Sequence, residues 1–381
     1  MIYFDNAATT WPKPEPVFQA MEHCMRYAGA NPGRGGHKMA IEAARILHRV
    51  RENLAKLFNI SNPLQIVLTS NATEALNLGI KGLLQPGDHV ITTSMEHNAV
   101  ARPLHLLSSR GVEVTKVQAD TTGYVTAQDI EKAIKSNTKA VVMTHASNVV
   151  GTLMPIAEVG RMTAARGIKL VVDAAQSAGI YDIDVQAMNI DLLAFPGHKG
   201  LLGPQGTGGL YIAPGIELQP LKEGGTGSNS ETLEQPDIIP DRFESGTPNT
   251  VGFAGLNAGL EYLFEVGIEN IRAHEEKLTA AFLAGLAQIP GVEIYGPNDA
   301  QRQAAVVAFN LSQSDSSEVG FVLDRVFDIA CRSGLHCAPE AHRTMGTCEK
   351  GVVRFSFAYS NTLDEIEQGL EALRKVAAEL A

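Results

Sequence analysis

The stretch AVVMTHASNVVGTLMPIAEVGRMTAARGIKLVVDA (140–174) decides the fold. Two short apolar runs, at 140–145 and 169–174, flank a segment near 156–166 that has the apolar spacing of a helix. Neither run alternates apolar and polar residues, which is typical of parallel strands covered on both faces. The stretch is therefore predicted to be a strand–helix–strand unit of an open parallel sheet.

Further strands with the same pattern lie on both sides of this unit. The predicted strands are QIVLTS (65–70), HVITTS (89–94), VEVTKV (112–117) and DLLAFP (191–196). Helices are predicted at 40–58, near 127–136 and from an N-cap at Asn71 to Leu83. Alternating strands and helices predict an α/β fold with a mostly parallel sheet.

The pattern changes after about residue 250. Here the sequence predicts one long helix at 252–288, a helix near 317–330, and strands at VEIYG (292–296), AVVAFNLS (305–312) and VVRFSFA (352–358). Thr362 and Glu365 have the spacing of a capping box that opens a C-terminal helix. A smaller α+β domain is therefore expected here. The Gly- and Ser-rich segment EGGTGSNSE (223–231) is predicted to be a mobile loop.

Composition excludes several classes of protein. Lys and Arg total 31 against 42 Asp and Glu, a formal net charge of −11, so a general nucleic-acid binder with a basic surface is not expected. Four cysteines in 381 residues are too few for a disulfide framework. No run of about 18 apolar residues predicts a membrane span, and the N-terminus lacks the pattern of a signal peptide. We expect a cytoplasmic globular protein without a membrane or nucleic-acid partner.

Polar residues follow the predicted strands, at the edge where open α/β sheets bind ligands. They are Ala72-Thr73 at a helix start, His97, Asn148, Asp173 with Gln176, and His198-Lys199. Each alone has a plainer explanation, such as a helix cap, a surface histidine or a solvated lysine. Together they provide what pyridoxal phosphate (PLP) needs: an amine for an imine, a carboxylate for the ring nitrogen, an imidazole and a phosphate-binding helix start. The sequence has no dinucleotide-binding or P-loop glycine motif after its first strand.

The C-terminal part adds a cysteine and an arginine. Cys337 follows His336 in a segment bounded by Gly334, which predicts an exposed loop, although a buried inert thiol is the commoner fate of a cytosolic cysteine. Arg354 suits a two-nitrogen contact with a substrate carboxylate, or a purely structural role. The remaining alternative is a metal site, whose candidate ligands would be Cys331, Cys337, His342 and Cys348. The spacing of these residues matches no common zinc pattern, so no metal is expected.

At this point the ordered motifs are recognisable, and the chain resembles the class V aminotransferase family of PLP enzymes, specifically the cysteine desulfurases. The motifs that carry the resemblance are IYFDNAATT (2–10), NPGRGGH (31–37), TSNATEALN (69–77), MEHNA (95–99), HASNVVGT (145–152), VVDAAQSAG (171–179), GHKG (197–200), GPQGTGGLY (203–211), ESGTPN (244–249) and RSGLHCA (332–338). They run nearly from end to end. The last motif is similar to the desulfurases whose catalytic cysteine lies on a short loop, a group that is selenocysteine lyase-like.

The resemblance implies PLP fold type I, with a large PLP-binding domain at 14–255. Residues 1–13 and 256–381 would form the small domain that carries the cysteine loop. The resemblance also implies the cofactor contacts, which are Lys199 as an imine, Asp173 at the ring nitrogen, Gln176 at the ring oxygen, His97 over the ring, and Ala72, Thr73 and His198 at the phosphate. Thr247 resembles the residue that reaches the partner subunit's phosphate, which implies a homodimer.

The implied activity is the conversion of L-cysteine to L-alanine, with sulfur transferred to Cys337 as a persulfide and passed to a sulfur-acceptor protein. Cys337, Lys199 and His97 would be catalytic, while Asn148 and Arg354 would hold the substrate carboxylate. The alternatives are selenocysteine lyase, cysteine sulfinate desulfinase, another class V lyase or aminotransferase, and a scaffold without turnover.

Two positions depart from the family pattern. Leu335 stands where the short-loop group often has a histidine, and Pro196 where many relatives have a serine that meets the phosphate. They leave open the subgroup and the phosphate contacts.

Overall fold

The computed structural model describes residues 1–33, 35–311 and 314–379, so Arg34 of the NPGRGGH motif lies outside it. A seven-stranded sheet with the order β2-β8-β7-β6-β5-β3-β4 forms its centre. The strands are β2 (Ile66–Thr69), β3 (His89–Thr93), β4 (Glu113–Val117), β5 (Thr138–Thr144), β6 (Lys169–Asp173), β7 (Leu192–Pro196) and β8 (Gly208–Ile212). β8 runs antiparallel to both neighbours, whereas β3 to β7 pair in parallel. The predicted α/β fold with a mostly parallel sheet is confirmed.

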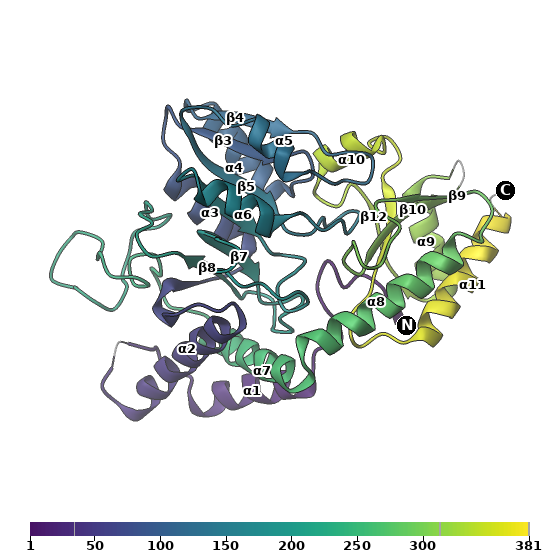
Figure 1. Ribbon diagram of the computed structural model, residues 1–381. Helices are drawn as coiled ribbons and strands as arrows, with labels where there is room; N and C mark the ends of the chain where they lie inside the picture. The colour runs from purple at the N-terminus through teal and green to yellow at the C-terminus, as the bar shows by residue number, and fades with distance from the viewer. Residues whose placement is uncertain (34, 312–313, 380–381) are drawn as a thin grey trace.

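Helices cover both faces of this sheet (Figure 1), and a hydrophobic core lies on each face. Alternate residues of β5 enter opposite cores: Val141 and Met143 face one, Ala140 and Val142 the other. One core is covered by α2 (Lys38–Leu57), α5 (Ala127–Lys132), α6 (Ile156–Ala164) and α7 (Thr250–Val266), and the other by α3 (Ala72–Leu83) and α4 (Asn98–Ser108). Burial on both faces explains why the strands read as continuous apolar runs.

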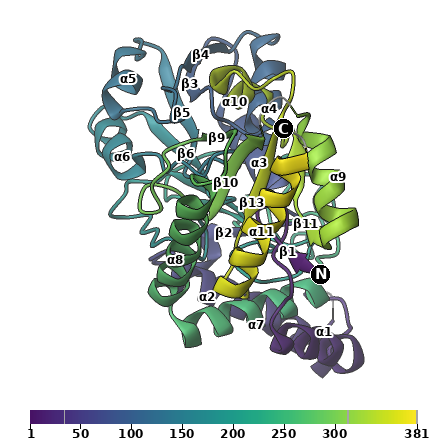
Figure 2. The ribbon, with the colours of Figure 1, turned by 90° about the vertical axis from the view of Figure 1, so that its right-hand side faces the viewer.

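The C-terminal part has its own sheet and core. The antiparallel strands β12 (Arg332–Gly334), β13 (Val352–Ser356), β10 (Val306–Leu311) and β9 (Val292–Tyr295) lie in that order. The helices α8 (Ile268–Leu286), α9 (Ser316–Phe327) and α11 (Leu363–Glu379) pack on it (Figure 2). The predicted capping box opens α11, because Thr362 accepts from the N–H of Glu365 and Glu365 accepts from the N–H of Thr362.

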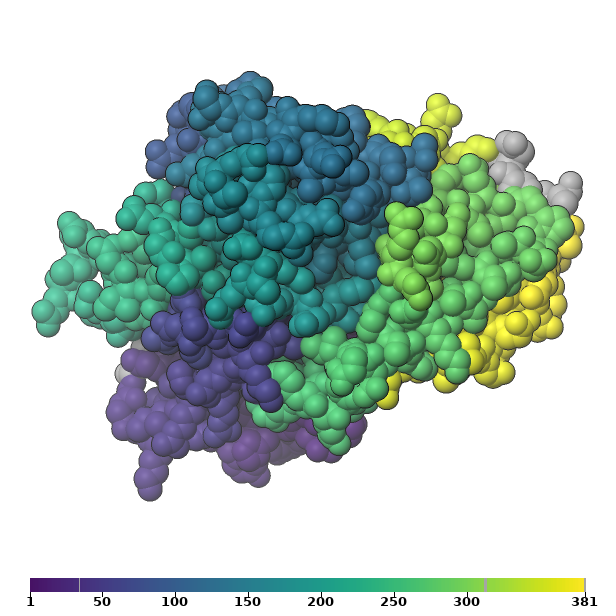
Figure 3. Space-filling model, viewed as in Figure 1, coloured from purple at the N-terminus to yellow at the C-terminus, as the bar shows by residue number. Residues whose placement is uncertain are grey.

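The N-terminal segment joins the C-terminal part. β1 (Ile2–Tyr3) pairs in parallel with β11 (Ile329–Ala330), and Phe4 enters the C-terminal core beside Phe355 and Phe357. The following residues then cross to the central sheet, where they reach the cavity described below. Figure 3 shows the two parts as one continuous body.

The prediction of a single helix at 252–288 was wrong, because the chain forms two helices there, α7 and α8, which are separated at Gly267. Gly267 has a φ of 87°, in the left-handed region that favours glycine. The prediction also missed α1 (Glu15–Tyr27) and strand β8. EGGTGSNSE (223–231) lies, as predicted, in a loop, which projects from the body beside β8 in Figure 1.

Candidate active site

A cavity of about 230 Å³ lies where the carboxyl ends of the parallel strands meet the C-terminal part. It brings together most of the predicted site residues: Ala72, Thr73, His97, Asn148, Asp173, Gln176, His198, Lys199 and Arg354. Two predicted residues lie outside it. Cys337 lines an adjoining groove that shares Thr73 and His97 with the cavity, and Thr247 lines a separate pocket.

The start of α3 gives one end of the cavity the properties of an anion site. Asn71 caps the helix by accepting from a first-turn N–H at 2.9 Å. Ala72 and Thr73 of that first turn line the cavity. Backbone N–H groups at a helix start lack intrahelical acceptors and carry the positive end of the helix dipole, so they attract a phosphate group.

Two buried carboxyl groups lie close to each other at the cavity, those of Asp173 and Glu96. Asp173 ends β6 and accepts from the N–H of Ala175 at 2.9 Å, and burial raises its pKa. Burial also raises the pKa of Glu96 to about 8, so Glu96 is a neutral acid at pH 7. Its Oε1 accepts from the Thr93 hydroxyl at 2.6 Å and from the N–H of Thr144 at 3.2 Å. Asp173 lines the cavity and Glu96 does not, so Asp173 is the carboxyl of this pair that a cationic ligand can reach.

His97 caps α4 and presents a neutral imidazole to the cavity. Its Nδ1 accepts from the N–H of Ala99 at 3.0 Å, which leaves the proton on Nε2. The pKa of His97 is lowered to about 4, first by burial and then by four surrounding cations, which are Lys199, Arg332, Arg102 and Arg354. His97 is consequently a neutral donor throughout the physiological pH range.

Lys199 lies in the turn after β7, and burial lowers the pKa of its amine to about 8. The preceding carbonyl, that of His198, is held by the N-terminal segment. It accepts from the N–H of Thr10 at 3.2 Å, the hydroxyl of Thr9 at 3.1 Å and Nζ of Lys13 at 2.6 Å. The Thr9 hydroxyl also lies 3.1 Å from Nδ1 of His198. Three donors on one carbonyl fix the backbone next to the reactive lysine.

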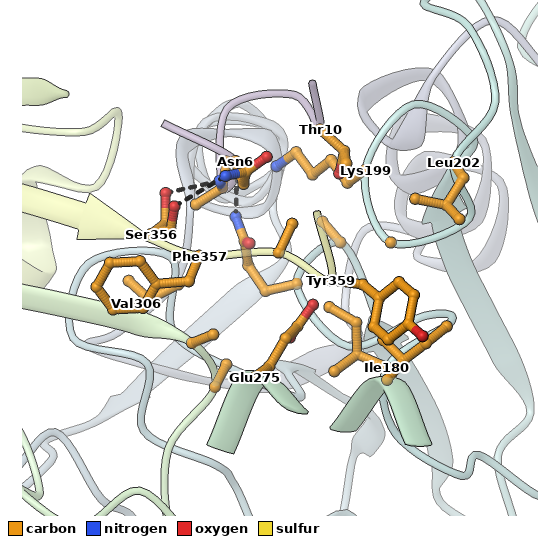
Figure 4. Close-up of a pocket in the computed structure, with 18 of the residues that line it drawn as sticks. Asn6, Thr10, Ile180, Lys199, Leu202, Glu275, Val306, Ser356, Phe357 and Tyr359 are labelled. Carbon is orange, nitrogen blue, oxygen red and sulfur yellow. Dashed lines mark hydrogen bonds between the residues drawn. The ribbon is translucent and has the colours of Figure 1, made fainter. Parts of the chain in front are cut away.

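A second cavity borders Lys199 (Figure 4). Glu275 of α8 points its carboxyl group into this cavity, where Oε2 has no partner among the described residues. Burial raises the pKa of Glu275 to about 8, although Arg272 opposes the rise. Gln176 lines both cavities and donates to the carbonyl of Ala7 at 3.0 Å. Lys199 therefore borders a second cavity that contains a buried neutral acid, Glu275.

Arg354 enters the active-site cavity from β13 and is only 1% exposed. Its Nη2 pairs with Asp5 at 2.7 Å, and its Nη1 donates to the carbonyl of Asn148 at 2.9 Å. Its Nε has no partner among the described residues, so the guanidinium keeps a donor for a ligand carboxylate. Asn148 donates its side-chain amide to the carbonyl of His336 at 2.7 Å. Asn148 thus connects the arginine to the cysteine loop, and its contact with a substrate carboxylate stays a prediction.

The cysteine loop connects β12 to α10 (Pro339–Met345) and is held at several points. His336 and Cys337 both have left-handed backbone, with φ of 49° and 57°. Such residues are uncommon and persist where surrounding contacts fix them. The carbonyl of Cys337 accepts from the N–H of Asn98 at 2.8 Å, and Arg332 Nη2 lies 3.3 Å from Cys337 Sγ. The thiol is exposed, which confirms the predicted exposed loop.

Two histidines, His336 of the loop and His342 of α10, pack against each other. The rings of His336 and His342 stack with centroids 5.8 Å apart, and both side chains are buried. Burial lowers the pKa of both residues, that of His336 to about 2. Leu335, the departure from the family pattern, is 42% exposed. The loop therefore rests on two neutral imidazoles.

The remaining cysteines differ from Cys337. Cys24 and Cys331 are less accessible, and burial raises the pKa of Cys331 to about 12, so that thiol is unreactive. Cys348 is exposed. Among the described residues, no group of three or more His, Cys, Asp or Glu side chains is placed to hold a metal ion.

The sequence interpretation assigned no role to several residues that the structure places at the site. Asp5 lies in the IYFDNAATT motif and Lys13 three residues after it, and their partners are 349 and 185 positions away. Glu96 and Arg332 also lie in quoted motifs, MEHNA (95–99) and RSGLHCA (332–338). Motif membership was therefore the available signal for all but Lys13, whereas nothing in the local pattern indicated the burial of Glu96.

Comparisons with known proteins give a consistent result. The profile of the family described as Aminotransferase class-V matches residues 2–368. A probable cysteine desulfurase of Methanothermobacter thermautotrophicus is 39% identical over 99% of this chain and 94% of the relative. A cysteine desulfurase of Cronobacter sakazakii is 34% identical over 99% of this chain and 93% of the relative.

Solved structures agree with the sequence relatives. The apo structure of a cysteine desulfurase from Thermococcus onnurineus has a TM-score of 0.92 and 35% identity over 99% of this chain and 95% of its own. A cysteine desulfurase of Escherichia coli has a TM-score of 0.88 and 28% identity over 99% of this chain and 94% of its own. No helix among the described residues is long and apolar enough to cross a membrane. The family resemblance read from the motifs is confirmed, and the chain belongs to the aminotransferase class-V family.

Proposed function

We propose that this protein is a PLP-dependent cysteine desulfurase, which converts L-cysteine to L-alanine and holds the released sulfur as a persulfide on Cys337. One observation carries the proposal: an exposed thiol stands on a fixed loop at a cavity that contains Lys199, Asp173 and Arg354. The relatives named cysteine desulfurase, which match nearly the whole chain, support it.

The residues of the cavity fit PLP. Asp173 is a buried carboxyl that forms no ion pair with another described residue, and a protonated ring nitrogen would supply the missing cation. Lys199 would hold the aldehyde carbon, and the start of α3 with Ala72, Thr73 and His198 would hold the phosphate. Gln176 would meet the ring oxygen, and His97 would lie against the ring. When bound, PLP supplies an electron sink for negative charge at the substrate Cα.

The protein's own residues orient the substrate and move its protons. Arg354, with Asn148 beside it, would bind the substrate carboxylate through its remaining donors and so fix the position of Cα. Lys199, with a pKa of about 8, is poised to take and return a proton at Cα near neutral pH. His97 is neutral, and its Nε2–H group can donate a hydrogen bond.

Cys337 carries the sulfur chemistry. Its thiolate attacks the sulfur of the bound cysteine, a sulfur–sulfur bond forms and the carbon–sulfur bond of the substrate breaks. The electron pair of the broken bond stays on carbon, which is protonated to the methyl group of alanine. Overall, one thiol and one cysteine give one persulfide and one alanine, without an external oxidant or reductant. Arg332, 3.3 Å from Sγ, stabilises the negative sulfur.

The proposal includes an assembly and a location. Thr247 lines a pocket separate from the active-site cavity and accepts from Asn31 at 3.2 Å, and in a homodimer it would reach the partner subunit's phosphate site. The large domain would span 14–255, and 1–13 with 256–381 would form the small one. Free cysteines support a reducing, cytoplasmic location.

Product analysis tests the proposal. The protein, with PLP and a reductant, is incubated with L-cysteine, and alanine and sulfide are quantified beside Cys337→Ala and the matched control Cys348→Ala. Equal amounts of alanine and sulfide are expected from wild type and the control, and neither from Cys337→Ala. Turnover that survives in Cys337→Ala, or pyruvate in place of alanine, would instead indicate another class V lyase. The same assay with selenocysteine and cysteine sulfinate separates the two related activities.

A further inference from the structure

A groove of about 380 Å³ leads away from Cys337 between the outer faces of α3 and α4, which pack side by side. On α3 it is lined by Thr73, Asn77 and Lys81, which follow one another at four-residue intervals. Eight residues of helix rise about 12 Å, so the α3 wall extends about that far from the end that Thr73 shares with the active-site cavity. An extended peptide of about four residues covers such a distance.

The charges in this groove are all of one sign. Lys81 and Arg102 line it, and no Asp or Glu does. Neither cation forms an ion pair with another described residue. The chain as a whole carries a formal net charge of −11, so this is a local positive site on an acidic protein. It attracts anionic groups and repels cationic ones.

Two exposed leucines accompany the groove and its thiol. Leu106 lines the groove and is 37% exposed, and Leu335, two residues before Cys337 in the chain, is 42% exposed. Exposed leucines beside a reactive thiol offer contact area to a polypeptide that a small thiol cannot use. The length of the groove, its positive charge and the exposed leucines together favour a protein segment over a small molecule.

We propose that this groove seats the cysteine-bearing segment of a sulfur-acceptor protein, and that this segment carries acidic residues within about four positions of its thiol. The inference rests on the proposed desulfurase function, because it assigns the route by which sulfur leaves Cys337. The acceptor thiolate attacks the outer sulfur of the persulfide, and a new sulfur–sulfur bond forms on the acceptor. The bond to Cys337 breaks and its electron pair returns to Sγ as a thiolate, so no redox partner is needed.

Thiol exchange at Cys337 tests the groove independently of desulfurase activity. The PLP-loaded Cys348→Ser protein is converted to a 2-pyridyl mixed disulfide at Cys337, and the release of pyridinethione by peptide thiols is followed by absorbance. The peptides share one length and one cysteine, and carry Asp and Glu, the matched Asn and Gln, or Lys beside it. Glutathione serves as a small anionic thiol.

The acidic peptide is expected to react about fivefold or more faster than its neutral match, and the Lys peptide slower. Lys81→Gln with Arg102→Gln should reduce the acidic advantage to below about twofold, whereas Lys375→Gln, an exposed position on α11, should keep it. An unchanged rate with the neutral peptide shows that the double variant is folded.

Equal rates for acidic and neutral peptides, or an acidic advantage that survives in the double variant, would overturn the proposal. Glutathione as fast as the acidic peptide would overturn it in favour of a small-molecule acceptor. Failure of the desulfurase function would be seen separately, as absence of alanine from L-cysteine with the peptide ranking intact.

Discussion

Glu275 allows a quantitative test of how this fold treats a buried acid. Its side chain is 3% exposed, and burial raises its pKa to about 8 from an ordinary value of 4.5. Oε2 has no partner among the described residues. Glu275→Gln keeps the shape of the side chain and removes the ionisable proton, so it isolates the effect of ionisation.

The sign of the effect follows from proton binding. The folded state binds the Glu275 proton more tightly than the unfolded state does, so this residue costs stability as pH rises from 4.5 toward about 8. At about 1.36 kcal/mol per pKa unit, the loss between about pH 5 and pH 7 comes to about 2 to 3 kcal/mol. The free energy of unfolding of Glu275→Gln, relative to wild type, should therefore increase by that amount over the same interval.

Urea denaturation of both proteins at pH 5, 6 and 7 measures this difference. Comparing variant with wild type cancels the other titrating groups, such as Glu96. Glu265→Gln, an exposed position on α7, is the matched control and should give a difference that does not change with pH. A pH-independent difference for Glu275→Gln as well would refute the reasoning, because the carboxyl group would then ionise normally in the folded chain.

Lys13→Met removes one of the three donors on the His198 carbonyl and should lower kcat about tenfold with little change in KM. Lys13→Arg should restore much of the lost kcat. Equal kcat values for the two variants in steady-state kinetics would contradict this positioning role. Arg354→Lys loses the planar guanidinium and should raise KM for L-cysteine about tenfold or more while the visible absorption of the loaded enzyme stays unchanged; an unaltered KM would remove Arg354 from substrate binding. The pKa of His97 is lowered to about 4, so the stability linked to its neutral state is lost as pH falls from 6.5 toward 4, and NMR of labelled histidine should show no protonation near pH 6.5; a midpoint close to 6.5 would show an unperturbed imidazole.

The parallel sheet and most of the cavity were predictable because both depend on local patterns. Strands buried on two faces need continuous apolar runs, and the polar residues that follow them necessarily meet at one edge. His97, Asp173 and Lys199 were found in this way. Each lies within a few residues of the strand that positions it.

Features that depend on distant or close-packed partners were not predictable in the same way. β8 was missed because glycine is rare in strands, yet a Cβ at Gly209 would lie 2.5 Å from the ring of Phe195, so packing requires glycine there. The Asp5–Arg354 pair joins residues 349 positions apart. Glu275 looks like an ordinary polar residue of a helix, and only the tertiary structure buries it.

The central claim is that Cys337 accepts sulfur from L-cysteine. Mass spectrometry of alkylated peptides after a brief single turnover without reductant tests it most directly. One added sulfur atom is expected on the Cys337 peptide, in amounts equal to the alanine formed, and none on the peptides of Cys348 or Cys331. Alanine formed with unmodified Cys337, or sulfur found first on Cys348, would show that Cys337 is not the residue that accepts the sulfur.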